Sequence, residues 1–185
     1  MKKDPLFFIA LLPPEEIQRE VTAFKQYIAD AWGPQHALKS PPHITLQPPF
    51  TRAEKDLSAL KKCLSGFASS QKAFSVELND FGAFPPRVIF VRPLINKRLE
   101  DLPAQLAHCL AEELDFRNPR FRQPFHPHMT IAHRDVEAGD FLKIWSYFRE
   151  KSFHRAFEAD TLALLRNVQG KWEIEANFRF GDAGD

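Results

Sequence analysis

A chain of 185 residues with a formal net charge of +1 is long enough to bury one substantial core. This near-neutral charge argues against a surface built for long, non-specific contact with duplex nucleic acid. No run approaches the ~20 consecutive apolar residues that span a membrane, so we expect a cytoplasmic protein without membrane contact.

The first predicted elements are a strand and a helix. Residues 6–12 form an apolar run with the length of a buried strand. Pro13-Pro14-Glu15-Glu16 then favours a helix start, because proline and acidic residues suit the first turn. Apolar residues recur after it at helical spacing, namely Ile17, Val21, Phe24 and Ile28. A strand over residues 41–46 follows, and we expect Gln47-Pro48-Pro49-Phe50 to end it, because proline cannot donate to a strand ladder.

A second helix and two strands are predicted next. Thr51-Arg52-Ala53-Glu54 fits a capping box, and the helix after it would bury Leu57, Leu60, Leu64 and Phe67. Phe74, Val76 and Leu78 alternate with polar residues, as in a half-buried strand. Asp80-Phe81-Gly82 predicts a turn before another strand at residues 88–91.

The second half of the chain repeats this plan. A helix over residues 97–114 precedes a second short strand near residues 127–131. A further helix then carries Phe141, Ile144, Trp145 and Phe148, and strands are expected at residues 153–159, 161–166 and 172–180. No linker divides the chain. We therefore predict an α+β fold in which residues 1–185 form one domain made of two duplicated lobes.

Two copies of one short motif carry the chemistry. Pro-Pro-His-Ile-Thr-Leu at residues 41–46 and Pro-His-Met-Thr-Ile at residues 127–131 each place a histidine and a threonine two residues apart. Residues i and i+2 of a strand point to the same face, so His43 with Thr45, and His128 with Thr130, would each form a pair. The corresponding positions of the two copies indicate that each half delivers one pair to a common cleft.

Two such pairs suit displacement at a phosphodiester. One histidine can accept a proton while the other donates one, and each role contributes roughly 10²- to 10⁴-fold to a rate. Threonine hydroxyls are short donors that can hold the non-bridging oxygens of a phosphate. No GxxxxGK[ST], GxSxG or HExxH motif occurs, and no carboxylate adjoins either copy, so we expect neither a cofactor nor a metal ion.

Other polar residues have two interpretations each. His126 shares strand parity with His128 and could reach the cleft, or it could lie at the surface. Arg117, Arg120 and Arg122 fit either a solvated loop or a contact for an anionic substrate. His36, His108 and His154 have no partner pattern and are expected in solvent or in packing. The two cysteines, Cys63 and Cys109, are expected to be reduced core residues.

At the two motifs the chain resembles the 2H phosphoesterase superfamily, in the branch called bacterial 2′-5′ RNA ligase or RNA 2′,3′-cyclic phosphodiesterase. The similarity extends over nearly the whole chain: Phe7-Phe8-Ile9-Ala10 with Pro13-Pro14-Glu15, residues 84–90, residues 125–130 and the closing strands. It implies a LigT-like bilobal fold with two pseudo-symmetric antiparallel-sheet lobes, flanked by helices, around a central groove.

The resemblance also implies an activity. This activity is hydrolysis of a 2′,3′-cyclic phosphate, on an RNA end or a small nucleotide, to a 2′-phosphate, with 2′-5′ RNA ligation as the reverse reaction. His43 would protonate the leaving 3′ oxygen, His128 would activate water, and Thr45 and Thr130 would hold the phosphate. No metal or ATP would be needed, and we expect a monomer.

The chain departs from the family just past each motif. His133 stands where members often carry arginine, with Arg134 one place later, and Gln47-Pro48-Pro49-Phe50 follows the first motif. Phe50, His126, His133 and Arg134 are therefore the further candidates for substrate contact. Two alternatives stay open: a non-catalytic module that binds RNA or a nucleotide, and a phosphodiesterase specific for a small nucleotide such as ADP-ribose cyclic phosphate.

Overall fold

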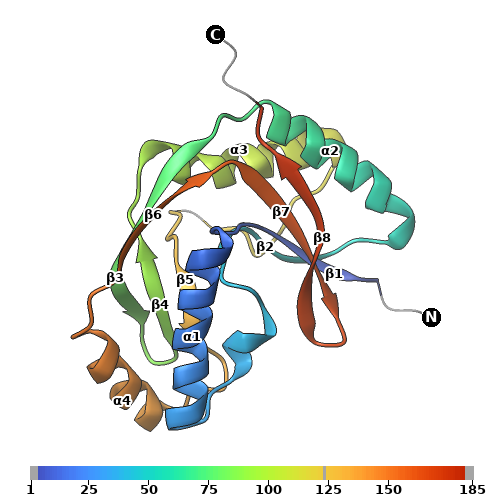
Figure 1. Cartoon of the computed structure of the whole chain (residues 1–185). Helices are drawn as coiled ribbons and strands as arrows, with labels where there is room; N and C mark the ends of the chain where they lie inside the picture. The colour runs from blue at the N-terminus through green and yellow to red at the C-terminus, as the bar shows by residue number, and fades with distance from the viewer. Residues whose placement is uncertain (1–3, 123, 182–185) are drawn as a thin grey trace.

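The computed structural model describes residues 4–122 and 124–181 (Figure 1). Its strands are β1 (Leu6–Leu11), β2 (Ile44–Thr51), β3 (Phe74–Phe84), β4 (Val88–Pro93), β5 (Met129–Ala132), β6 (His154–Ala159), β7 (Thr161–Val168) and β8 (Lys171–Arg179). Its helices are α1 (Glu15–Trp32), α2 (Leu57–Ser69), α3 (Lys97–Leu114) and α4 (Ala138–Phe148), with short 3₁₀ helices η1 (His36–Lys39) and η2 (Glu54–Asp56).

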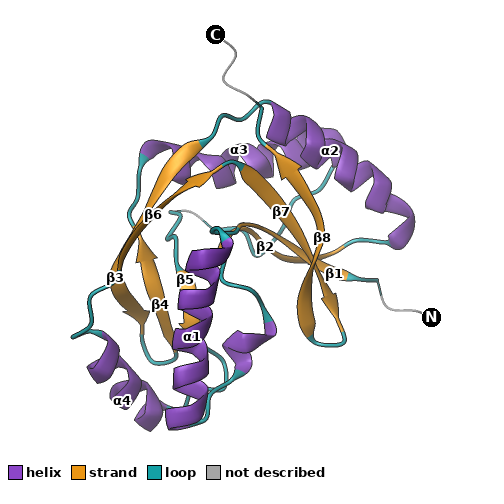
Figure 2. Ribbon diagram, in the orientation of Figure 1, coloured by secondary structure: helices purple, strands orange, loops and turns teal. Residues whose placement is uncertain are grey.

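The strands form two four-stranded antiparallel sheets (Figure 2). The first sheet has the order β2-β1-β7-β8 and the second has the order β5-β4-β3-β6. Each motif therefore leads into a strand at the edge of its sheet. The first sheet combines strands from both ends of the chain, so the two sheets are not built from separate halves. The predicted α+β class with two antiparallel sheets flanked by helices is confirmed, while duplication of the lobes stays a prediction.

One hydrophobic core joins the two sheets and the four helices. Helix α1 connects β1 to β2 in the first sheet but packs against β5 of the second. Helix α3 connects β4 to β5 in the second sheet but packs against β2 of the first. This reciprocal packing ties each motif strand to the opposite half of the fold. Among the described residues, no helix is long and apolar enough to cross a membrane.

Strand β2 continues through its two prolines, so the prediction that Gln47-Pro48-Pro49-Phe50 ends the strand is wrong. Ile9 pairs with Gln47 and Phe7 pairs with Phe50, which leaves Pro48 and Pro49 together opposite one residue of β1. Prolines are tolerated at such a bulge on an edge strand, where no ladder hydrogen bond is lost. Asn118 and Arg120 donate to the carbonyls of Pro48 and Pro49 at 2.8 and 3.1 Å, and so cover this edge.

The turn predicted at Asp80-Phe81-Gly82 is also wrong, because β3 runs on to Phe84. Asp80 has a φ of 57° and lies at a register shift in the pairing of β3 with β4, as in a bulge. Its carboxylate accepts a hydrogen bond from the backbone N–H of Phe153 at 2.9 Å, which anchors the segment before β6. The chain reverses instead at Pro85-Pro86-Arg87.

The predicted capping box does not form. Helix α2 begins at Leu57, after the 3₁₀ turn η2, and its start carries no side-chain cap. The Glu54 carboxylate instead accepts two hydrogen bonds from Arg166 of β7, at 2.8 and 3.1 Å. A contact distant in the sequence has therefore replaced the local one.

Gly82 of β3 provides a test of the second sheet. It pairs with Phe90, and a Cβ at this position would lie 2.5 Å from two atoms of the Phe90 ring. We expect Gly82→Ala to lower the unfolding free energy by about 1–3 kcal/mol in urea denaturation, because the ring must shift. Gly66 of α2 is the control: a Cβ there meets nothing within 4 Å, so Gly66→Ala should raise stability by roughly 0.5–1 kcal/mol. Equal effects of the two substitutions would contradict this account.

Candidate active site

The two motif histidines are held in the same way. The Nδ1–H of His43 donates to the carbonyl of Pro41 at 2.7 Å, and the Nδ1–H of His128 donates to the carbonyl of His126 at 2.8 Å. In each case the acceptor lies two residues before the ring. A carbonyl can only accept, so the neutral imidazole carries its proton on Nδ1 and leaves Nε2 as the proton-accepting nitrogen. The duplicated motif thus yields two rings with the same tautomer.

Both histidines and both threonines line one cavity of about 190 Å³ between the two sheets. The structure therefore brings together the four residues that the motifs predict, His43, Thr45, His128 and Thr130. They lie at or just before the edge strands β2 and β5, and the alternate residues Ile44, Leu46, Met129 and Ile131 are buried in the core. Strand parity thus holds on both sides of the cavity.

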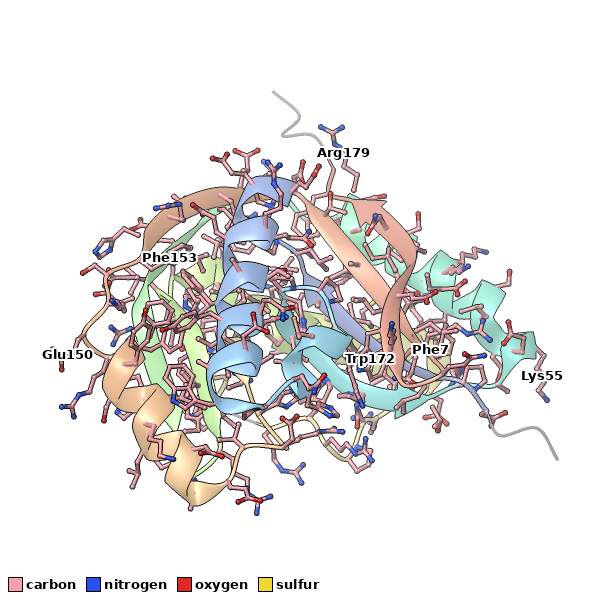
Figure 3. All side chains as sticks on the ribbon, turned by 60° about the horizontal axis from the view of Figure 1, so that its bottom comes forward. Phe7, Lys55, Glu150, Phe153, Trp172 and Arg179 are labelled. Carbon is pink, nitrogen blue, oxygen red and sulfur yellow. The ribbon has the colours of Figure 1, made fainter. Side chains whose placement is uncertain are left out.

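Aromatic rings surround the two histidines. The His43 ring lies 4.7 Å from the ring of Phe8. The Phe8 ring lies 4.6 Å from the ring of Trp172, a residue of β8 that is labelled in Figure 3. The His128 ring lies 5.3 Å from Phe84 and 5.7 Å from Phe90. Removal from water disfavours the charged imidazolium, so burial lowers the pKa of His43 to about 3 and also lowers the pKa of His128. Both rings are therefore neutral in the free protein at pH 7.

A basic cluster lines the same cavity: His36 and Lys39 from η1, and His133 and Arg134 after β5. The rings of His36 and His133 are 4.9 Å apart. The carboxylate of Asp135 accepts hydrogen bonds from the backbone N–H groups of Gln35 and His36, at 2.9 and 2.8 Å, and so holds η1 against this segment. Burial and the neighbouring positive charges lower the pKa of His133 to about 4.

Two single residues lie in places that the sequence did not indicate. His36, expected in solvent or in packing, packs on His133 and also lines the cavity, because η1 folds back onto the segment after β5. Phe50, a candidate for substrate contact, is only 5% exposed and packs on Phe7 and Phe116 in the core. His133 and Arg134, by contrast, do line the cavity.

A second cavity, of about 370 Å³, lies beside the first and shares Thr45 and His128 with it. Its walls are mainly apolar and aromatic, and they include Leu46, Pro48, Phe84, Phe121 and Phe125. His126, Arg120 and Arg122 also line it. His126 thus lies near His128, at a cavity adjoining the four motif residues.

One group of side chains in the described part of the chain could hold a metal ion, and it is not at the histidine cavity. Cys63 of α2 lies with its Sγ 3.7 Å from the Sγ of Cys109 of α3, and Glu113 is the third member. Burial raises the pKa of both thiols, so the protonated form is favoured. Both cysteines are free, and Cys63 is buried in the core.

Known proteins share the sequence pattern of this chain. A family model described as the 2'-5' RNA ligase superfamily matches residues 13–171. The chain belongs to this superfamily. A relative from Geobacillus kaustophilus is 27% identical over 176 residues, which are 94% of this chain and 95% of the relative. A relative from Bacillus cytotoxicus is 29% identical over 178 residues with the same coverage, and both are named "Putative phosphoesterase".

Solved structures share the fold of this superfamily member. The crystal structure of TT0787 of Thermus thermophilus has a TM-score of 0.71 and 23% identity, and covers 97% of this chain and 100% of that one. E. coli LigT complexed with 3'-AMP has a TM-score of 0.66 and 19% identity, and covers 96% and 99%. The predicted 2H phosphoesterase relationship and LigT-like fold are both confirmed.

The low pKa of His43 predicts a loss of stability in acid. The pKa of this ring is about 3 in the fold and about 6.5 in an unfolded chain, so the unfolded state binds the proton first as the pH falls. The neutral His43 ring contributes its full share to the free energy of unfolding above pH 6.5. Between pH 6.5 and pH 3 this share is lost, by at most about 1.4 kcal/mol per pH unit. We expect His43→Gln to flatten this decline in urea unfolding between about pH 7 and pH 5. His108→Gln, on an exposed face of α3, should leave the decline as in the wild type.

Proposed function

We propose that the protein is a metal-independent phosphodiesterase that opens 2′,3′-cyclic phosphates, on RNA ends or small nucleotides, to 2′-phosphates. One observation carries this proposal: two histidines with the same tautomer face one cavity together with two threonine hydroxyls. Nucleotide or RNA binding alone does not require two groups that transfer protons. Metal-independent displacement at phosphorus can use both, one on the attacking water and one on the leaving oxygen.

In the reaction, one histidine takes a proton from water through its Nε2 while the other gives a proton to the leaving oxygen. The family resemblance assigns the proton-donating role to His43 and the water-activating role to His128. Thr45 and Thr130 donate hydrogen bonds to the non-bridging oxygens, whose charge grows as water attacks. If the 5′-hydroxyl of a second RNA end attacked the cyclic phosphate in place of water, the same 3′ oxygen would leave and a 2′-5′ linkage would form with the same four groups.

The aromatic cavity beside His128 supports a nucleoside as the group that carries the phosphate. Its rings Phe84, Phe121 and Phe125 offer faces on which a base can stack, and Arg120 and Arg122 can bind a neighbouring phosphate. The E. coli LigT structure that shares this fold contains 3'-AMP. We infer that the base occupies the aromatic cavity while the cyclic phosphate occupies the histidine cavity.

Replacement of either histidine tests the proposed function. We expect His43→Ala and His128→Ala each to lower turnover of adenosine 2′,3′-cyclic phosphate by roughly 10²- to 10⁴-fold, with the native fold retained by circular dichroism. Phosphorus NMR should identify the wild-type product as the 2′-phosphate, and EDTA should not change the rate. His108→Ala is the control and should retain full activity.

Three results would contradict the proposal. Full activity of both histidine variants would exclude the acid–base pair, and a strict metal requirement would exclude the mechanism. Binding of the cyclic phosphate without any product would favour the nucleotide-binding module instead. A comparison of rates on cyclic mononucleotides, ADP-ribose cyclic phosphate and cyclic-ended oligonucleotides then separates the RNA enzyme from one specific for a small nucleotide.

Phe121→Ala tests the aromatic cavity. Phe121 lines this cavity without lining the histidine cavity, so its loss should affect the base and not the chemistry. We expect kcat/KM for adenosine 2′,3′-cyclic phosphate to fall roughly tenfold, since stacking of one base contributes about 1–3 kcal/mol. Hydrolysis of ribose 2,3-cyclic phosphate, which has no base, should change little. Leu142→Ala, an exposed apolar residue of α4, serves as the control. An equal fall for both substrates would place the base elsewhere.

A further inference from the structure

Lys25 of α1 is the one charged side chain that is buried in the described part of the chain. It is 2% exposed, and its ammonium donates to the backbone carbonyl of Ser40 at 2.9 Å. No carboxylate of a described residue forms an ion pair with it. Burial lowers its pKa to about 8, so it still carries its charge at neutral pH.

This ammonium is costly to the fold. Lys25 shares the buried face of α1 with Ile17, Val21 and Ile28, where an apolar side chain would pack without loss of hydration. A buried cation without an anionic partner destabilises the protein that contains it. Costs of this kind are typical of residues retained for a function.

The contacts of Lys25 lead to His43. The Lys25 ammonium donates to the carbonyl of Ser40. The next carbonyl along the chain, that of Pro41, accepts the Nδ1–H of His43 and so orients its ring. Burial is the main cause of the low proton affinity of His43 and His133, and the positive charge of Lys25 lowers it further. The groups that face His43 are Lys25 from α1, His128 before β5 and His133 after it, and none of them is a carboxylate.

The second histidine has a different environment. His128 donates its Nδ1–H to the carbonyl of His126, an exposed residue, and no buried cation lies behind it among the described residues. The two motifs are therefore alike in sequence and tautomer but unlike in electrostatics. This inequality decides which of the two rings is charged when the site holds a single proton, and an acid–base pair works with one neutral and one charged ring.

We propose that Lys25 is a positioning residue that fixes residues 40–43 and keeps His43 the weaker proton acceptor of the two motif histidines. The first proton taken up by the free site then goes to His128, so the form with a charged His43 and a neutral His128, which the proposed hydrolysis uses, is the less populated of the two singly protonated forms. The inference rests on the proposed function, since it concerns how that site divides one proton between two rings. In a bell-shaped profile of kcat/KM against pH, the fall at low pH (the acidic limb) then reports the ionisation of His43. The fall at high pH (the alkaline limb) reports the ionisation of His128, whichever way the reaction runs.

Lys25→Met removes the charge and keeps an apolar side chain of similar length. We expect the acidic limb of kcat/KM for adenosine 2′,3′-cyclic phosphate to move up by about one pH unit while the alkaline limb stays in place. Lys25→Gln keeps an N–H donor near the Ser40 carbonyl, and should show the same upward movement because it also lacks the charge. Both variants should unfold at or above the wild-type temperature, because an uncompensated buried charge has been removed.

Lys62→Met is the matched control, since Lys62 is an exposed lysine of α2 and the change in net charge is the same. An acidic limb that stays in place in a folded Lys25→Met variant would overturn the proposal, as would an equal shift in Lys62→Met. Proton NMR titration of the histidine Cε1–H signals, assigned with single histidine variants, gives a second readout. The His43 signal should titrate at higher pH in Lys25→Met. This titration needs no turnover, so it tests Lys25 even if the proposed function fails.

Discussion

The packing of α1 on β5 and of α3 on β2 is the contact on which the site depends. Each of these helices connects two strands of one sheet and rests on the motif strand of the other. The open edges of β2 and β5 are thereby held across one cavity, and His43 and His128 come from opposite sides of it. A loss of core packing beneath either helix would therefore move one histidine relative to the other, even though neither helix contributes a motif residue.

Within this arrangement of helices and sheets, the local backbone orients the imidazole ring of each motif histidine. A carbonyl two residues before the histidine accepts its Nδ1–H on both sides, and the aromatic rings of Phe8 and Phe90 pack against the imidazoles. Orientation thus comes from the motif itself, whereas proton affinity comes from the surroundings. Beyond burial, Lys25, His128 and His133 oppose a positive charge on His43, whereas His126 opposes one on His128, so the two near-identical motifs have different electrostatic surroundings.

Local patterns in the sequence predicted the helices and the four motif residues, because strand parity and helical periodicity depend on near neighbours. Patterns that compete with a distant contact were misleading. Pro48 and Pro49 resemble a strand end, but an edge bulge covered by Asn118 accommodates them; Asp80 resembles a turn residue, but its carboxylate anchors Phe153. His36 and Lys25 belong to no motif. His36 reaches the cavity only because η1 folds against the segment after β5, and Lys25 reaches the Ser40 carbonyl only because α1 packs on η1.

The charges around the cavity favour an anionic substrate. Lys39, Arg134 and several histidines line it, and no described residue that lines it is a carboxylate. An anion that enters supplies the missing negative charge and raises the proton affinity of every imidazole nearby. In the proposed reaction, a bound phosphate can therefore bring one histidine to its charged form, while the free protein keeps both motif rings neutral. Substrate binding and protonation of the proposed acid would then be linked through the charge of the substrate, with no carboxylate needed from the described residues of the cavity.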